Sequence, residues 1–376
     1  MTGNFIVERE NRHSSDPFLL SVIVLLLGIG LTFLFSASYP NALRLNKAPE
    51  FFLLRQAVMA AAGFAGALFL MNIPIEVLKK LVFAVVLTSL LLSVIVLLAG
   101  RDIQGARRWI IIGGRSFQPS EVVKLALILY LADVFSKKED SLDSFYSLSH
   151  PLVMVLLFSL LTFAQNDFST AVFLILIGSA IFFIAGVKFR YFFTGFLASV
   201  PFLLILVFSR EHRVKRLIAF LDPDKDPAGV GYQIIKAREA LISGGFWGKG
   251  IGSGLKKMGT LPEAHSDFIF AVIGEEAGFI GILIIIILFA IFAARGYMIS
   301  YRCTDRFCFY TGFGITTSIL YQALMNMAVV SGAVPATGIP LPFFSHGGSS
   351  IMVTLLMCGI LLNLSRSTKN ERELPL

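Results

Sequence analysis

The chain alternates between long apolar runs and shorter polar stretches over most of its length. Apolar runs of about 17–25 residues are typical of transmembrane helices, because a spanning backbone must satisfy its own hydrogen bonds in lipid. The dyad alternation typical of a membrane β-barrel is absent from the sequence. The pattern therefore predicts an all-α, polytopic membrane protein with ten spanning helices, at about residues 17–37, 51–71, 81–99, 119–135, 148–164, 168–187, 191–209, 267–294, 308–330 and 347–364.

One polar segment, 210–266, is too long for a simple connector, and we expect it to have its own structure. Its stretch GYQIIKAREALISGG has the apolar stripe of an amphipathic helix on the membrane surface, with Lys236 and Arg238 toward water. The glycine-rich GGFWGKGIGSG that follows offers backbone N–H groups to a phosphate, although an irregular loop is the more frequent outcome. We expect a single transmembrane domain over 1–376.

Composition and charge support this class and suggest a topology. The chain is 56% hydrophobic and only 15% charged, which excludes a water-soluble domain of this size. Basic residues in the short loops predict that both termini are cytoplasmic. The opposite side nevertheless holds two basic loops, 100–118 and 210–266. Either long loops translocate regardless of charge, or these loops meet an anionic substrate or lipid head group.

The chain lacks the common catalytic motifs, so the chemistry must come from charged residues at the membrane edges. Asp267 lies in LPEAHSDFIF, where the long polar loop meets an apolar run. A partly desolvated carboxylate at such a boundary is suited to general-base catalysis, whereas a helix N-cap is the structural alternative. Glu263 can share either role, and His265 lies between the two carboxylates in sequence.

Glu275 and Glu276 follow inside the same predicted span. Helical periodicity places Glu275 near the Asp267 face. Two adjacent carboxylates within a membrane are costly, so we expect them to line a cavity or to pair with basic groups.

Glu121 and Lys124 have the i, i+3 spacing of a helical ion pair. They either neutralise each other near the surface or form a cavity wall. Arg101, Arg107 and Arg108 precede them, and arginine forks suit phosphate oxygens, although arginines beside a tryptophan are also ordinary interface anchors.

The segment GIPLPFFSHGGSS, 338–350, places proline and glycine at membrane depth. Irregular backbone there requires protein or a water-filled cavity around it. We therefore include Ser345 and Ser349 among the candidate cavity residues.

Several stretches together resemble the SEDS family of FtsW/RodA peptidoglycan glycosyltransferases, and the division branch more than the elongation branch. They are GARRWIIIGGRSFQPSEVVKLA at 105–126, QNDFSTA at 165–171, FLDPDKDPAGVGYQ at 220–233, LPEAHSDFIFAVIGEEAGFIG at 261–281 and GIPLPFFSHGGSS at 338–350. The resemblance covers nearly the whole chain. Three positions, Asn166, Ser169 and His346, depart from the residues usual in the family.

The resemblance implies ten helices, a cytoplasmic N-terminus and polymerisation of lipid II at the outer face of the inner membrane. It places the family's essential aspartate on Asp267 and its outer-cavity pair on Glu121 and Lys124. It also implies a class B penicillin-binding protein as transpeptidase partner, other division proteins, and no nucleic acid. An inverting reaction needs no covalent intermediate. No cofactor is assigned, and a divalent cation, Mg²⁺ or Mn²⁺, is the one candidate.

Two other functions fit the same residues. A lipid II flippase would share the carboxylates and the lipid, but it predicts charges along a transmembrane path rather than at the outer edge. A non-catalytic division scaffold predicts that the cavity residues tolerate substitution.

Overall fold

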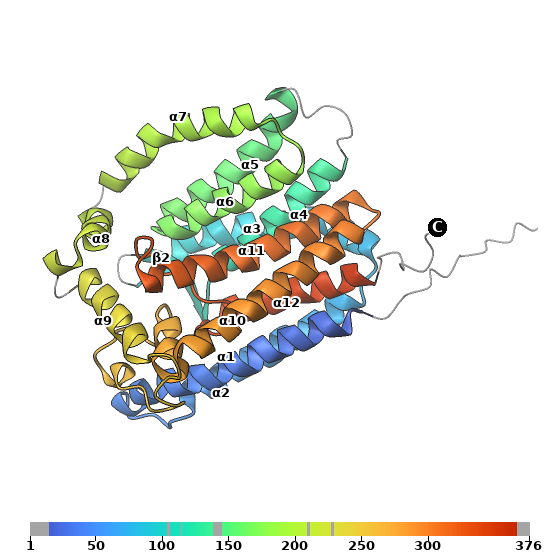
Figure 1. Cartoon of the computed structure of the whole chain (residues 1–376). Helices are drawn as coiled ribbons and strands as arrows, with labels where there is room; N and C mark the ends of the chain where they lie inside the picture. Colours follow the sequence, from blue (N-terminus) through green and yellow to red (C-terminus); the bar gives the residue numbers. More distant parts are fainter. Residues whose placement is uncertain are drawn as a thin grey trace, which may run out of the picture.

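The computed structural model describes residues 15–103, 106–113, 115–137, 145–208, 211–226 and 229–366. In this part of the chain each predicted span coincides with a helix, and the ten helices form an elongated bundle (Figure 1). Seven helices of the described part are long and apolar enough to cross a membrane, and α4, α6 and α7 occupy the other three predicted spans. The prediction of an all-α polytopic protein is therefore confirmed. The ten helices are α1 (Pro17–Arg44), α2 (Phe51–Met71), α3 (Ile75–Ala99), α4 (Pro119–Ser136), α5 (Phe145–Ala164), α6 (Phe168–Ile184), α7 (Phe189–Phe208), α10 (Ile269–Arg302), α11 (Arg306–Ser331) and α12 (Gly348–Ser365).

Three helices extend by six or more residues beyond their predicted bounds, because hydropathy marks only the apolar part of a helix that projects into the interface. Helix α1 continues to Arg44, α3 begins at Ile75, and α10 runs on to Arg302. Helix α10 also contains a break at Gly278, whose φ of 65° and ψ of −163° are not helical. A Cβ atom at Gly278 would lie 2.3 Å from the backbone nitrogen of Gly248, so only glycine permits this close approach.

Small residues bring α2 and α12 into close contact. A Cβ added to Gly359 of α12 would lie 2.5 Å from the Cα of Ala67, and one added to Gly63 of α2 would lie 2.9 Å from the Cα of Met352. Spanning helices associate through such close backbone approach, because lipid tails supply no hydrophobic drive between helices. The contact holds α12 in the centre of the bundle, where 83% of its residues are buried.

The segment after α3 forms a small antiparallel sheet that the sequence pattern did not predict. Strands β1 (Arg101–Ile103), β2 (Ala106–Ile112) and β3 (Arg115–Phe117) pair in that order. The run of Trp109 and three isoleucines in β2 favours strand over helix, because β-branched and aromatic side chains fit a pleated surface.

The long polar segment has its own structure, as predicted. It contains α8 (Glu211–Leu221), α9 (Val230–Ser243) and the short 3₁₀ helices η1 (Pro223–Lys225) and η2 (Lys256–Met258). Helix α9 packs against α10 and α11. Arg238 is directed inward and donates from Nη2 to the carbonyl oxygen of Gly332 at 3.1 Å, so the prediction that this side chain faces water is wrong.

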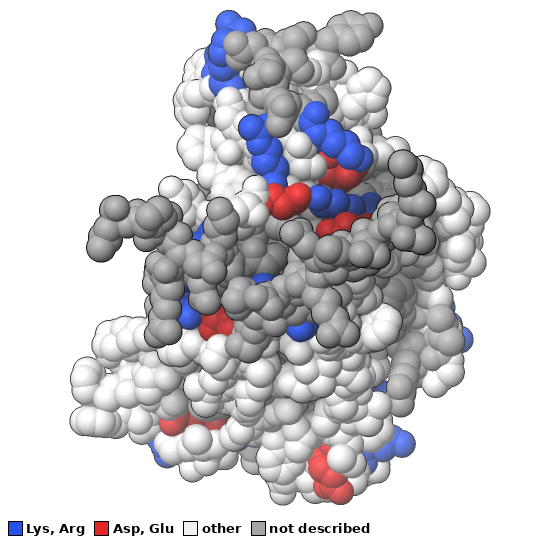
Figure 2. All heavy atoms as spheres, turned by 90° about the vertical axis from the view of Figure 1, so that its right-hand side faces the viewer, with Lys and Arg blue, Asp and Glu red and all other residues white. Residues whose placement is uncertain are grey.

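The two ends of the bundle differ in character. At one end, α1 begins beside the last turn of α12, where the backbone N–H of Asp16 donates to Ser365 Oγ at 3.0 Å. Here Lys and Arg side chains lie beside Asp and Glu (Figure 2), and the ion pairs include Arg295 with Asp16 at 2.7 Å. Helices α8 and α9 and the turn that carries Asp267 lie at the opposite end (Figure 1).

Candidate active site

Asp267 lies in a tight turn that ends where α10 begins. Glu263 starts the turn with a φ of 52°, and its carbonyl oxygen accepts the backbone N–H groups of Ser266 and Phe268 at 3.1 and 3.2 Å. Phe268 is the N-cap residue of α10, with no side-chain capping bond. The alternative interpretation of Asp267 as a helix cap is therefore wrong, and its carboxylate is available for another role.

The turn is fastened to the irregular segment that precedes α12. Asn326 of α11 donates from Nδ2 to the carbonyl oxygens of Asp267 and Ile339, both at 2.9 Å. Ser345 Oγ donates to the carbonyl oxygen of Ser266 at 2.6 Å. The backbone N–H of His346 donates to the carbonyl oxygen of His265 at 2.9 Å. The irregular backbone predicted at membrane depth is thus surrounded by protein that satisfies its polar groups.

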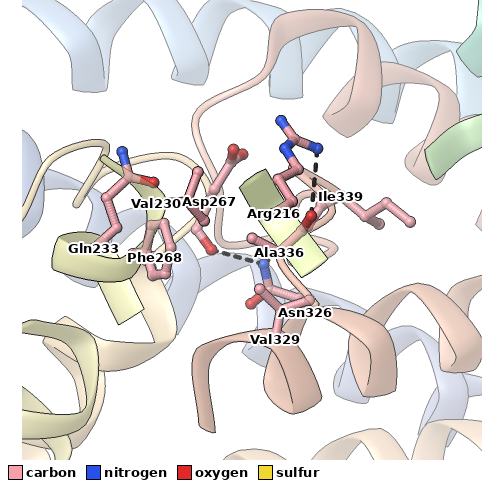
Figure 3. Close-up of a pocket in the computed structure, with 10 residues that line it drawn as sticks. Arg216, Val230, Gln233, Asp267, Phe268, Asn326, Val329, Ala336 and Ile339 are labelled. Carbon is pink, nitrogen blue, oxygen red and sulfur yellow. Dashed lines mark hydrogen bonds between the residues drawn. The ribbon is translucent and has the colours of Figure 1, made fainter. Parts of the chain in front are cut away.

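A cavity of about 50 Å³ opens beside Asp267 (Figure 3). In the close-up, Gln233 of α9 and Arg216 of α8 lie on opposite sides of the aspartate, and Asn326 lies below it. Arg216 donates from Nη1 to the carbonyl oxygen of Ala336 at 3.3 Å. The described cavity wall is otherwise largely apolar. Its lining in the described part of the chain is Arg216, Val230, Gln233, Asp267, Phe268, Asn326, Val329, Ala336, Gly338 and Ile339.

The surroundings of Asp267 favour a carboxylate that takes up a proton near neutral pH. Burial raises the pKa of Asp267 to about 6, helped by the negative charge of Glu263 and opposed by Arg108 and Arg216. Within the described residues the Asp267 carboxylate accepts no hydrogen bond. Its lone pairs are therefore free to accept a proton from a bound hydroxyl group, and a pKa near the working pH suits a general base.

Two arginines supply positive charge near this carboxylate. Burial and the neighbouring Arg108 lower the pKa of Arg216, while Asp267 and Asp167 oppose that shift. Arg108 Nη1 lies 3.7 Å from Asp167 Oδ2, and Gln118 Nε2 donates to the same oxygen at 3.2 Å. Asp167 also caps α6 by accepting from the backbone N–H of Thr170, so this residue both begins the helix and contacts Arg108.

The described cavity wall contains none of the three predicted arginines, and it does not contain His265. Arg101 and Arg107 are exposed on β1 and β2. His265 packs its ring against Phe52 and His346, at centroid distances of 5.0 and 5.7 Å. Burial lowers the pKa of both imidazoles, that of His346 to about 4, so both are neutral at pH 7.

Three predicted cavity residues contact the surroundings of the site without lining the cavity: Glu263, Ser345 and Ser349. Glu263 is exposed and accepts from Ser266 Oγ at 2.6 Å, so it acts on Asp267 through its charge. Ser345 fastens the turn as described above. Ser349 Oγ accepts from the backbone N–H of Gln118 at 2.9 Å and thereby links α12 to the start of α4.

Glu121 and Lys124 form the predicted ion pair on α4, with Oε2 and Nζ 2.8 Å apart and both side chains buried. Lys124 Nζ also donates to Gln322 Oε1 at 2.8 Å, and Gln322 Nε2 donates to the carbonyl oxygen of Pro340 at 3.0 Å. The pair does not line the cavity. It connects α4 through α11 to the segment that carries Ser345 and His346.

Glu275 and Glu276 are also buried but lie away from the cavity wall. Glu276 accepts from Lys257 Nζ at 2.5 Å and from Ser36 Oγ of α1 at 2.7 Å. Glu275 accepts from Lys249 Nζ at 2.7 Å. We predicted that these carboxylates either line a cavity or pair with basic groups, and the structure shows the pairing.

The same carboxylates accept backbone N–H groups at the end of the glycine-rich loop and just after it. Within the loop, Gly252 and Gly254 donate to Glu276 at 3.1 and 3.4 Å. The two residues that follow, Leu255 and Lys256, donate to Glu275 at 3.1 and 3.0 Å. The suggestion that this loop binds a phosphate is therefore wrong for these donors, because side chains of the protein already occupy them. The expected helical register between Asp267 and Glu275 also fails, because α10 begins only at Ile269.

The donor set does not form a resident metal site. No group of three or more His, Cys, Asp or Glu side chains suited to an ion occurs within the described residues. Asp267 is the one carboxylate in the cavity wall. A divalent cation, Mg²⁺ or Mn²⁺, remains a prediction.

Four polar cavity or support residues were missed from the sequence. Arg216 and Gln233 lie in the long polar segment, where nothing in their spacing sets them apart. Gln322 and Asn326 carry a signal that was overlooked, because two amides at i, i+4 in an otherwise apolar span face a common polar partner.

Comparison with known proteins agrees with this architecture. Residues 17–370 match the family of cell cycle proteins that comprises FtsW, RodA and SpoVE. A relative from Trichlorobacter lovleyi, described as a probable peptidoglycan glycosyltransferase FtsW, is 39% identical over 94% of both chains. A protein of the same description from Borreliella burgdorferi is 38% identical over 94% of this chain and 97% of its own.

Solved structures show the same fold. A chain from a peptidoglycan synthase complex that coordinates polymerization and crosslinking superposes with a TM-score of 0.78 at 26% identity, over 94% of this chain and 98% of its own. The rod shape determining protein RodA of Thermus thermophilus superposes with a TM-score of 0.71 at 26% identity, over 96% and 100%. The chain therefore belongs to the FtsW, RodA and SpoVE family of peptidoglycan glycosyltransferases, as a multi-pass protein of the inner membrane.

Proposed function

We propose that this chain polymerises lipid II into glycan strands at the outer face of the cytoplasmic membrane, with inversion at the sugar carbon. The observation that carries the proposal is the Asp267 carboxylate. It faces a small cavity beside Arg216, accepts no hydrogen bond from the described residues, and has a pKa raised to about 6. Family membership supports the reaction class.

The reaction follows from these groups. Asp267 accepts the proton of the acceptor sugar's 4-hydroxyl group as the oxygen attacks the anomeric carbon of the donor. The bond between that carbon and the pyrophosphate breaks, and the pyrophosphate-linked lipid leaves with the bonding electrons. Because attack and departure occur on opposite faces, an α-linked donor gives a β-linked glycan without a covalent enzyme intermediate.

Positive charge must offset the charge that develops on the leaving pyrophosphate. Arg108 is the nearest candidate, since its charge acts on Asp267 from outside the described cavity wall. Arg101 and Arg107 are exposed on the adjoining sheet and can extend the basic surface. Guanidinium forks suit phosphate oxygens, and preorganised charge is often the largest single contribution to such catalysis.

The proposal includes a location and partners. Both termini would lie in the cytoplasm and the cavity on the extracytoplasmic side, as the basic short loops predict. A class B penicillin-binding protein would crosslink the strands, as is consistent with the relative found in a synthase complex. Septal synthesis together with other division proteins is the expected setting, because the relatives described above carry the FtsW description.

A polymerisation assay tests the proposal directly. The purified chain is incubated with labelled lipid II, with and without its partner transpeptidase, beside the variant Asp267→Asn. We expect glycan strands from the unmodified chain and a loss of about 10²–10⁴-fold in rate from the variant, the usual cost of removing a general base.

The same assay separates the other two functions. A flippase would make no strands in either form, even with the partner present. A scaffold would support division in cells that carry only the Asp267→Asn variant. Full polymerisation by that variant would refute the role assigned to Asp267.

A further inference from the structure

Two hydrogen-bonding atoms in the cavity wall are left without a partner. Asn326 is 1% exposed, and its Nδ2 is already committed to two carbonyl oxygens. Because both partners are acceptors, the orientation of the amide is fixed, and its Oδ1 is the atom that remains. Within the described residues, Asn326 Oδ1 and Arg216 Nε are buried and have no hydrogen-bond partner. Leaving buried polar atoms unpaired is costly, so such atoms point to a missing ligand group.

The orphan atoms are complementary in type. Asn326 Oδ1 can only accept a hydrogen bond, and Arg216 Nε can only donate one. A ligand that satisfies both must therefore offer one donor and one acceptor close together.

The size and walls of the cavity narrow the ligand further. Its volume of about 50 Å³ corresponds to roughly four water-sized groups at about 10–15 Å³ each. Val230, Val329 and Ile339 supply apolar surface beside the polar atoms. The group that fits is small, with a donor, an acceptor and a methyl-sized apolar end.

We propose that this cavity is a subsite for the acetamido group of the acceptor sugar. Its N–H would donate to Asn326 Oδ1, its carbonyl oxygen would accept from Arg216 Nε, and its methyl group would contact the valines. The inference rests on the proposed function and assigns Asn326 and Arg216 as the residues that recognise the acetamido group of its acceptor sugar.

The position of Asp267 agrees with this assignment. The 2-acetamido and 4-hydroxyl groups are 1,3-related on the sugar ring, so the aspartate that lines the same cavity can receive the proton of the 4-hydroxyl group. The pyrophosphate fits less well, because the carboxylate of Asp267 would repel it and the valine walls would leave its oxygens unsolvated.

The subsite is tested by enlarging the N-acyl group of the substrate and, separately, by enlarging the cavity that holds it. We would compare lipid II with an analogue whose N-acetylglucosamine carries an N-propionyl group, using the full chain with its partner transpeptidase. One extra methylene in a filled pocket changes selectivity by about 10–200-fold, so we expect the unmodified chain to prefer the acetyl form by about tenfold or more. Val329→Ala should remove about tenfold of that preference, because it vacates the space that the methylene needs.

Matched controls make the result specific. Val330→Ala changes the same residue type one position along α11, outside the cavity wall, and should leave the acetyl-to-propionyl ratio unchanged. Val230→Ala, from α9, provides a second enlarged cavity should Val329→Ala not fold.

The outcomes distinguish the two proposals. If the unmodified chain polymerises both substrates equally, or if neither enlarged cavity changes the ratio, the subsite is refuted and the polymerase stands. If the unmodified chain polymerises neither substrate, the proposed function fails and the subsite falls with it.

Discussion

Replacing Asp267 by asparagine should stabilise the protein while it removes activity. Burial raises the pKa of this carboxyl group from 3.8 to about 6, so the folded protein pays a cost to keep it ionised. A rise in pKa from 3.8 to about 6 corresponds to about 3 kcal/mol of free energy. The half-buried carboxylate retains some contact with solvent, so this value is an upper limit.

The pH dependence gives the sign. Because the folded-state pKa lies above the unfolded value, the folded state binds the proton more tightly, and ionisation destabilises it. The cost is absent below about pH 4, grows between pH 4 and 6, and is complete above pH 6. Asp267→Asn should therefore raise the free energy of unfolding by up to about 3 kcal/mol at pH 8 and leave it unchanged near pH 3.5.

Reversible unfolding in mild detergent, followed at several pH values, measures this difference. Asp305→Asn provides a control of opposite sign. Burial alone would raise the pKa of Asp305, but the bond from Lys79 and the backbone N–H of Cys308 outweigh it and lower the pKa. That variant should be destabilised at neutral pH. An Asp267→Asn variant no more stable than the unmodified protein at pH 8 would refute the electrostatic reasoning, whatever its activity.

Three further outcomes follow from the same contacts. In a pH–rate profile, kcat/KM for polymerisation should fall below about pH 6. Glu263→Gln should move that fall to lower pH, because it removes a negative charge that raises the pKa of Asp267. Lys257→Met should lower the free energy of unfolding by about 3–5 kcal/mol, because it leaves the buried carboxylate of Glu276 without its ion-pair partner. Adding Glu276→Gln should recover part of that loss, and equal stability of the single and double variants would contradict this. Exchanging Glu121 and Lys124 together should restore part of the polymerisation that either single charge reversal loses; a folded double variant no better than the worse single one would exclude the pairing role.

The helices could be predicted because lipid leaves the backbone few choices. A run of apolar residues long enough to span must be helical, so each of the ten apolar runs located a helix. Asp267 was identifiable for a related reason, since it is a carboxylate at the edge of such a run. Helix ends were less certain, because α1 and α10 continue with residues that tolerate the interface.

The partners of Asp267 could not be predicted from local pattern. Asn326 lies 59 residues after Asp267 in the sequence. Arg216 belongs to α8, which precedes the glycine-rich loop in the sequence. Their meeting depends on how α8, α9 and α11 pack, which no periodicity encodes. Glu275 was placed near Asp267 by assuming a continuous helix, whereas a turn separates them before α10 begins.

The contrast among the carboxylates near the site argues for Asp267 as the reactive one. Asp167 caps α6 and contacts Arg108, Glu121 pairs with Lys124, and Glu275 and Glu276 bind lysines and loop N–H groups. Each of these groups is held by a basic side chain or by backbone N–H groups. Asp267 is positioned as firmly, but through its backbone oxygen, and its carboxylate is left without a hydrogen bond from the described residues. A fold that satisfies four carboxylates and leaves the fifth unsatisfied beside a cavity gives up stability there, which is expected where a group must react rather than hold the structure together.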